Sequence, residues 1–392
     1  MPASLRCWFW SSSFSGLAYD RHGSPSRYLP SALLITCFQP ILEGRLMSVY
    51  QFDPLRDPRW HEFLQRDNRA SIFHTAGWLE ALQRSYGYEP TVFTTSNERE
   101  PLANAMVVCR VNSWLTGRRL VSLPFSDHCE PLVEGAGDLE QIMLALRDEV
   151  QRGQLKYVEI RPVSSLRQGD VAFSQSSEFC LHSVDLRPRV VEIYQKLHKD
   201  SIRRKIVRAN REGLLYEKGT SRDLLEKFYQ LFVVTRARHG LPPSPFLWFS
   251  NLVECLGERL QVRIASKQGK PVAGIITLTY KNSIVYKYGA SDVGFNNLGG
   301  MPFLLWKAIL EAKSEGLEKL DLGRSDNDDD GLITFKDRWG SVRSDLTYWR
   351  WPTSSHKDSL DTQRQRIAKS VLGFVPNLVR VEVGNFFCRH LG

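Results

Sequence analysis

Hydrophobic and polar positions follow no regular period over the first 46 residues, whereas a regular pattern begins just after Met47. The early stretches 11–16 and 22–26 are rich in serine, glycine and proline, and they fit neither the period of a helix nor that of a strand. We therefore expect residues 1–46 to be a translated leader or a disordered arm, and Met47 to be the first residue of the native protein.

From residue 47 to about 187 the pattern predicts an α/β block. Trp78, Leu79 and Leu82 share one face of a helix at i, i+1 and i+4, and Asp138 is placed to cap a later helix. The predicted helices are 56–67, 75–84 and 138–152, and the predicted strands are 91–95, 102–111, 119–123 and 156–161.

A second block, residues 188–352, repeats this style. A long helix is expected over 190–212, where Gly213 would end it in a left-handed conformation. An antiparallel meander of three strands is expected to follow. Its strands are 261–266, 272–280 and 283–290; the other predicted strands are 214–217, 319–322 and 346–351, and the other predicted helices are 222–239, 245–256, 302–316 and 332–339. Residues 353–392 are expected to form a C-terminal helical tail.

The order strand, strand, strand, loop, helix, strand over 261–322 resembles the core of the GNAT acyltransferase fold. The first block has a weaker version of the same order. The resemblance implies tandem GNAT-like domains of the α/β (α+β) class, with mixed, largely antiparallel sheets flanked by helices. The expected domains are 47–187 and 188–352.

Composition limits the class of protein. Hydrophobic residues make up 42% and charged residues 24%, as in a soluble globular chain, and no stretch approaches the roughly 20 apolar residues of a spanning helix. The seven cysteines are scattered without a CxxC pair, which favours reduced thiols in the cytoplasm over a zinc site. The net charge of +9 favours phosphorylated, nucleic-acid or anionic-membrane partners.

The most specific motif lies near the end of the second block. It consists of Asp321-Leu322-Gly323-Arg324-Ser325, followed by a loop and by a segment from Gly331 to Gly340 that contains Phe335-Lys336. It resembles the D-x-G and G-x-x-x-F-K-x-x-W/F-G segments of the FemAB/FemABX-like transferases and the related CelD/BioF-like, exopolysaccharide-associated acetyltransferases. The resemblance implies that Phe335 and Lys336 are catalytic.

The chemistry of acyl transfer gives Lys336 a role. An amine that attacks an ester or thioester builds a tetrahedral oxyanion, and a fixed cation beside that oxygen lowers the barrier. Phe335 would exclude water from such a site. The alternative is an amphipathic turn with Lys336 exposed and Phe335 in the core.

Two features could bind phosphate. Arg204, Arg208 and Arg211 recur at i, i+4 and i+7 on a basic helix, in a stretch that resembles R-K-x-x-R-x-A-x-x-x-G of the same transferases. Gly299 and Gly300 precede the helix from Pro302 and could seat the diphosphate of CoA or of a nucleotide-linked lipid. The GNAT Q/R-x-x-G-x-G/A signature is poorly matched, which counts against acetyl-CoA. A solvated helix face and a plain strand-to-helix turn are the alternatives.

Three further residues are candidates. Asp127, in the loop 123–131, could take the proton of the attacking amine, as could its neighbour His128. Tyr288 is expected to face the same side of its strand as Tyr286 and to line an acceptor groove. Arg324 is a candidate phosphate ligand.

An acidic loop follows Arg324. Asp326, Asp328, Asp330 and Asp337 fit the spacing of a calcium loop, but position 12 lacks the bidentate glutamate and a strand precedes the loop. We interpret the loop as solvated and expect no metal, leaving calcium as the alternative.

The sequence thus predicts an acyl- or aminoacyl-transferase acting on an amine of a cell-envelope or exopolysaccharide precursor. The donor would be acyl-CoA or aminoacyl-tRNA, with no certain cofactor. The acceptor would be a nucleotide- or lipid-linked saccharide or peptide. The alternatives are a CelD/BioF-like N-acetyltransferase and an inactive GNAT-like binding protein. The protein is expected in the cytoplasm, and its mixed apolar and basic tail could contact the inner membrane peripherally.

Overall fold

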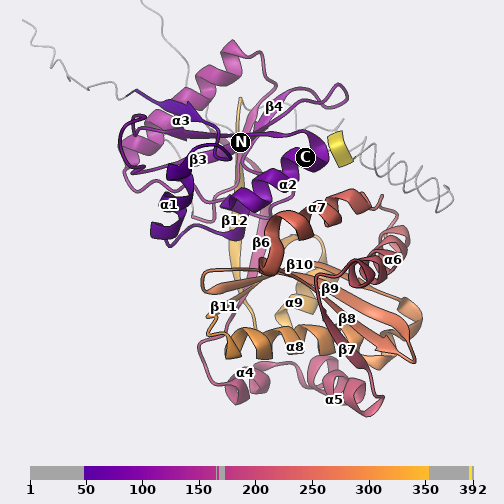
Figure 1. Ribbon diagram of the computed structural model, residues 1–392. Coiled ribbons are helices and arrows are strands. Elements are labelled where there is room, and N and C mark those ends of the chain that lie inside the picture. The colour runs from indigo at the N-terminus through magenta and orange to yellow at the C-terminus, as the bar shows by residue number, and fades with distance from the viewer. Residues whose placement is uncertain (1–47, 165, 167–172, 353–387, 391–392) are drawn as a thin grey trace, which may run out of the picture. The chain divides into compact units, whose positions relative to one another are not determined.

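The computed structural model describes residues 48–164, 166, 173–352 and 388–390 (Figure 1). The chain divides into two compact units, Met1–Leu46 and Met47–Gly392, and all the described helices and strands belong to the second. The leader or arm expected at 1–46 lies outside the described residues, as does the predicted tail except for 388–390.

The first half of this unit, up to residue 185, forms the α/β block expected from its pattern. Its elements are β1 (Tyr50–Phe52), α1 (Pro58–Arg66), α2 (Ala76–Tyr86), β2 (Glu89–Thr94), β3 (Met106–Val111), β4 (Arg119–Val121), α3 (Ala136–Arg152), β5 (Val158–Ile160) and β6 (Ser174–Asp185). Gly135 stands at the N-cap of α3, so the cap predicted at Asp138 is wrong. Asp138 lies in the first turn instead and accepts a hydrogen bond from Thr95.

The second half, residues 186–352, begins with a broken helix. Its elements are α4 (Val190–Lys196), the π-helical turn η2 (Lys199–Arg203), α5 (Arg204–Arg211), β7 (Leu215–Gly219), α6 (Arg222–Arg238), α7 (Phe246–Leu256), β8 (Leu260–Lys267), β9 (Lys270–Tyr280), β10 (Ser283–Ser291), η4 (Val293–Leu298), α8 (Gly300–Ser314), β11 (Lys319–Asp326), α9 (Asp330–Asp337) and β12 (Val342–Trp351). The single helix predicted over 190–212 is wrong, because Leu197 is extended and the His198 amide donates to Arg338 instead of continuing the helix.

Within the described ranges, twelve strands form one mixed sheet in the order β1-β2-β3-β4-β5-β12-β6-β11-β10-β9-β8-β7. All neighbours are antiparallel except two pairs, β4 with β5 and β10 with β11. In each half, three antiparallel strands are followed by a helix (α3 or α8) and by a strand parallel to the third. The repeat of the GNAT-like order is therefore confirmed in both halves.

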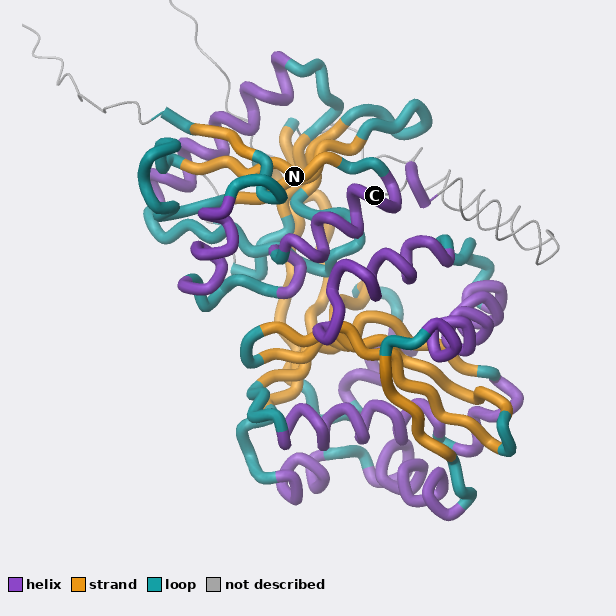
Figure 2. Tube along the Cα trace, viewed as in Figure 1, coloured by secondary structure: helices purple, strands orange, loops and turns teal. Residues whose placement is uncertain are grey.

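Two strands join the halves. The long strand β6, which the sequence analysis missed, pairs with β11 of the second half and with β12. Strand β12 returns to pair with β5 of the first half. The last strand of each half thus pairs with a strand of the other half, and the sheet continues from one half to the other (Figure 2).

The sheet of the second half separates two apolar cores. Val262 and Ile264 point toward α6 and α7, whereas Ala265 and Ile275 point toward α8. This follows from the alternation of side chains along a strand. Figure 1 shows α6 and α7 on one side of β8–β10 and α8 on the other. Helix α5 packs on the outer side of α8.

Candidate functional site

The candidate site forms where parallel strands β10 and β11 separate. Their pairing ends at Val285 and Asp321. Both strands are irregular just beyond this point: β10 shifts register between Tyr286 and Tyr288, and β11 between Asp321 and Arg324. Such bulges re-aim side chains and are common next to active sites. The opening between the two strands receives polar side chains from both halves of the chain.

Asp127 enters this opening from the first half. Its Oδ2 lies 3.1 Å from Lys287 Nζ, and its carbonyl oxygen accepts a hydrogen bond of 2.6 Å from Tyr348. A Cβ atom on Gly323, whose φ is +72°, would lie only 2.9 Å from Asp127 Oδ2. Gly323 of the D-x-G motif is thus required both by its left-handed backbone and by the close approach of this carboxylate.

Lys336 lies on α9 and is 2% exposed. Its Nζ donates to the carbonyl oxygens of Gly323 at 2.8 Å and Arg324 at 2.7 Å, which leaves one N–H of the ammonium for another acceptor. Burial lowers its pKa to about 8, although Asp127 and Asp321 act in the opposite direction. The alternative of an exposed lysine is therefore wrong. The neighbouring Phe335 is partly buried and packs against the apolar core that includes residues of α8.

His128 is held by a partner 193 residues away. Its Nε2 lies 2.8 Å from Asp321 Oδ2, and Asp321 Oδ1 accepts a hydrogen bond from the Gly323 amide. Burial raises the pKa of Asp321, but the hydrogen bond and charge of His128 outweigh it, so the net pKa is lowered. The first residue of the D-x-G motif thus ties the Asp127 loop to β11, a pairing that sequence spacing could not indicate.

Lys287 is a further functional candidate that the sequence analysis missed. It is the bulged residue of β10, its side chain is 6% exposed, and its ammonium lies 5.3–5.8 Å from the ring centres of Phe73, Trp78 and Tyr288. The regular alternation of side chains expected along this strand did not indicate that Lys287 faces the site. Only the bulge turns the lysine toward Asp127.

The bulge also separates two tyrosines that the alternation placed together. Tyr286 packs with the core of α8, whereas Tyr288 packs with the core of α6 and α7, so the prediction that they face one side is wrong. The Tyr288 hydroxyl accepts a hydrogen bond of 2.8 Å from Trp248, and burial raises its pKa. Tyr288 remains near the site through its contact with Lys287.

Arg324 borders the site on the side of β6 and β12. Its guanidinium stacks on Phe179, 4.1 Å from the ring centre, and lies 5.3 Å from that of Tyr348. This stacking fixes the plane of the guanidinium while its edge keeps N–H donors. A role in phosphate binding stays a prediction.

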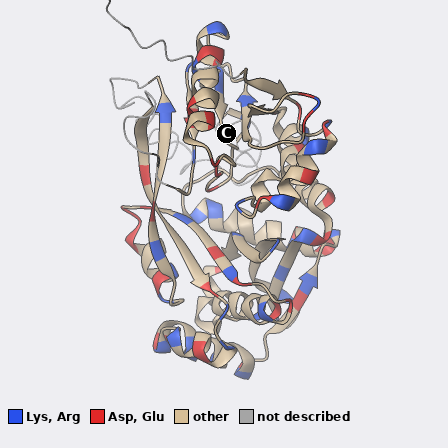
Figure 3. Cartoon of the chain, turned by 90° about the vertical axis from the view of Figure 1, so that its left-hand side faces the viewer, with Lys and Arg blue, Asp and Glu red and all other residues tan. Residues whose placement is uncertain are grey.

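The phosphate candidates of the second half form a separate group at the N-terminus of α8. A Cβ on Gly299 would lie 2.5 Å from the Lys205 carbonyl oxygen, and a Cβ on Gly300 would lie 2.8 Å from the Cβ atom of Ala273. Packing against α5 and β9 therefore explains both glycines. Arg204 pairs with Asp200 at 2.9 Å, whereas Arg208 and Arg211 lie 3.8 Å from Glu212. Basic and acidic positions are similarly interspersed over the chain (Figure 3).

No group of three or more His, Cys, Asp or Glu side chains that could hold a metal ion occurs in the described residues. The acidic loop 326–330 is exposed. Five described cysteines, Cys109, Cys129, Cys180, Cys255 and Cys388, are free thiols. None of the described helices is both long and apolar enough to cross a membrane.

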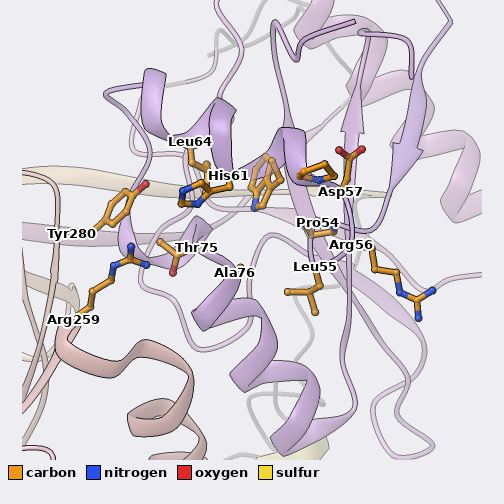
Figure 4. A pocket seen from close by; sticks show the side chains of 12 residues that line it. Pro54, Leu55, Arg56, Asp57, His61, Leu64, Thr75, Ala76, Arg259 and Tyr280 are labelled. Atoms are coloured by element: carbon orange, nitrogen blue, oxygen red, sulfur yellow. The ribbon is translucent and has the colours of Figure 1, made fainter. Parts of the chain in front are cut away.

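A pocket of about 240 Å³ lies elsewhere, between α1, the start of α2 and the end of β9. Arg259 and Tyr280 come from the second half and the other lining residues from the first (Figure 4). None of these residues is among the polar side chains at the β10–β11 opening, which include Asp127, Lys287 and Lys336. We place the candidate site at the β10–β11 opening, because buried titratable groups converge there.

Comparison with known proteins agrees with this architecture. Residues 196–365 match the family model described as acetyltransferase (GNAT) domain. The structure superimposes on FemX with a TM-score of 0.63 at 12% identity, covering 82% of this chain and 100% of that one. L-PGS from Bacillus licheniformis gives 0.50 at 14% identity, covering 81% and 97%. A search of curated proteins finds no match.

The class defined by these observations is a tandem GNAT-like fold, with its candidate site where the two halves meet. At 12–14% identity the solved structures show the fold alone. The narrower likeness to CelD/BioF-like acetyltransferases stays a prediction.

The buried lysine makes stability depend on pH. Its pKa falls from 10.5 in the unfolded chain to about 8 in the fold, so between these values unfolding takes up a proton and stability rises with pH. We expect the free energy of unfolding of the wild type, relative to Lys336→Met, to increase by about 3 kcal/mol from pH 7 to 10.5. Denaturant titrations across this range measure the difference. A difference that does not change with pH would contradict the lowered pKa.

Proposed function

We propose that this protein transfers an acyl or aminoacyl group to an amine of a cell-envelope precursor. The observation that carries the proposal is the buried Lys336 ammonium beside Asp127 in the β10–β11 opening. A buried ammonium with two carbonyl partners and a lowered pKa lacks a full counter-charge. A developing oxyanion would supply that charge, so its stabilisation is greatest in the transition state.

Each polar group of the opening has a role in this chemistry. The amine nitrogen forms a bond with the donor carbonyl carbon, and the carbonyl oxygen becomes negative beside the remaining N–H of Lys336. Asp127, oriented by Lys287, accepts the proton that the amine loses. The carbon–oxygen or carbon–sulfur bond to the leaving group then breaks, and the leaving group takes up the proton. His128 and Asp321 position the Asp127 loop.

Of the two donors, aminoacyl-tRNA fits better than acyl-CoA. The loop that would seat the CoA diphosphate is packed against α5, with the Lys205 backbone occupying the space beside Gly299. The basic ridge of Arg204, Arg208 and Arg211 lies on that same helix and suits the phosphates of a nucleic acid. The acceptor we propose is a nucleotide- or lipid-linked saccharide or peptide, and an exopolysaccharide precursor belongs to this class.

A transfer assay tests the proposal. The purified protein is incubated with aminoacyl-tRNA or with acetyl-CoA, together with UDP-linked amino sugars and peptides, and the acceptor mass is measured. We expect an aminoacyl mass increase that requires the protein and no acetyl increase. Transfer from acetyl-CoA alone would overturn the choice of donor. Stabilisation of the protein by an acceptor without transfer from either donor would favour an inactive binding protein.

A further inference from the structure

Arg324 is a partly buried cation beside the β10–β11 opening, and its charge is not balanced by the protein. Its guanidinium contacts the rings of Phe179 and Tyr348, but in the part of the chain that the structure describes it has neither a carboxylate partner nor a hydrogen bond. Asp326, two positions further along β11, is exposed and forms no ion pair with it. Removing an unpaired charge from water is unfavourable, so a bound anion would stabilise this arginine.

The carboxylates that enter the opening are already paired. Asp127 Oδ2 lies 3.1 Å from Lys287 Nζ, and Asp321 Oδ2 lies 2.8 Å from His128 Nε2. The two carboxylates therefore have partners other than Arg324. Among the described residues, no acidic side chain of the opening supplies the counter-charge of Arg324, so this charge is available to a substrate.

The surroundings of Arg324 hold its guanidinium in place. Phe179 and Tyr348 come from β6 and β12, which lie next to β11 in the sheet. Tyr348 is 3% exposed, its hydroxyl donates to the Asp127 carbonyl at 2.6 Å, and the Arg161 guanidinium lies 4.9 Å from its ring centre. Because these rings are fixed, the guanidinium plane is oriented before a ligand binds. The N–H groups along its edge match two oxygens of a phosphate group.

Arg324 also lies close to the reacting centre. Its backbone carbonyl accepts the hydrogen bond of 2.7 Å from Lys336, so the guanidinium is within the length of one arginine side chain of that carbonyl. In an aminoacyl ester of a nucleotide, only the ribose separates the ester from the 5′-phosphate. In acyl-CoA, the whole pantetheine arm separates the thioester from the diphosphate. A phosphate near the reacting carbonyl is therefore a feature of the nucleotide ester.

We infer that Arg324 binds the 5′-phosphate of the nucleotide that carries the aminoacyl group, and that it selects this donor over acyl-CoA. The inference rests on the proposed function, because it takes Lys336 to mark the position of the donor carbonyl. It assigns to Arg324 a contact with the donor, whereas Lys336 and Asp127 act on the reacting atoms.

Two stable donor analogues test the inference with the full chain: 3′-alanylamido-3′-deoxyadenosine and its 5′-phosphate. They differ only in the phosphate, and their amide replaces the reactive ester. We expect the wild type to bind the phosphorylated analogue about 10–100-fold more tightly in calorimetry, the usual effect of charge-assisted hydrogen bonds. In Arg324→Met this ratio should fall to about one. Arg324→Lys should keep part of it, because an ammonium has the charge without the planar pair of donors.

Arg343→Met is the matched control, since it removes an exposed arginine from the opposite face of β12 and should keep the wild-type ratio. Binding of the unphosphorylated analogue shows that each variant is folded. Equal wild-type binding of both analogues, or of neither, would overturn the inference, as would an unchanged ratio in Arg324→Met. An unchanged ratio with weaker binding of UDP-N-acetylglucosamine in Arg324→Met would assign the guanidinium to the acceptor instead. A preserved phosphate preference without transfer from any donor would argue against the proposed function alone.

Discussion

Replacing Lys336 by methionine is expected to lower the rate of acyl transfer by about 10²–10³-fold, the usual effect of removing one donor to an oxyanion. Methionine fills a similar volume but cannot donate to the developing charge or to the Gly323 and Arg324 carbonyls. Single-turnover kinetics with the donor identified by the transfer assay measures the effect. Lys319→Met, which removes an exposed lysine from the start of β11, is the control and should leave the rate unchanged.

The pH profile separates a chemical role of Lys336 from a structural one. Because the pKa of Lys336 is about 8, the wild-type rate should fall as pH rises through this value and the ammonium loses its proton. Lys336→Arg keeps a charge that is not lost in this range, so its remaining activity should extend to higher pH. A Lys336→Met protein with the wild-type rate and the same alkaline decline would contradict the proposed role.

Replacing Glu159 by alanine is expected to cost about 3–5 kcal/mol of stability, because it removes the buried carboxylate that balances the charge of the partly buried Arg161 guanidinium. Glu159 lies on β5 and accepts hydrogen bonds from Arg161 at 2.9–3.0 Å and from Arg350 of β12 at 2.8 Å. Arg161 in turn donates to the Leu123 and Ser126 carbonyls, beside Asp127. The change should therefore loosen both the junction of the halves and the Asp127 loop. Denaturant unfolding measures the loss.

Glu254→Ala is the matched control for Glu159. It removes a carboxylate from an exposed pair with Arg84, so the expected loss is below about 1 kcal/mol.

The contribution of Glu159 to stability should also depend on pH. Burial raises the pKa of Glu159, but the two arginines outweigh this effect and lower the net pKa below 4.5. The stability that its charge contributes should be complete above pH 4.5 and disappear as pH falls through the folded-state pKa. Similar losses for Glu159→Ala and Glu254→Ala would show that this network does not stabilise the fold.

The candidate site was only partly predictable from the sequence. The D-x-G and Phe-Lys motif led to Lys336, and the residue types of the loop 123–131 led to Asp127. Nothing local pointed to Lys287, because a bulge alone turns it from the regular face of β10. The pairing of His128 with Asp321 joins residues 193 positions apart, so no spacing rule applies to it.

By itself, the sequence determined the elements whose pattern repeats over several turns or strands, such as α6, α8 and the meander β8–β10, because local periodicity and turn residues fix them. It also determined the order of elements in each half. Only the tertiary structure decided that β6 is a strand. Its first five residues, Ser174–Glu178, contain no apolar side chain, and the pairing with β11 and β12 supplies the hydrogen bonds that make it one. Partners distant in the chain also decide three other features. These are the break at Leu197, the bulge at Lys287 and the burial of Lys336.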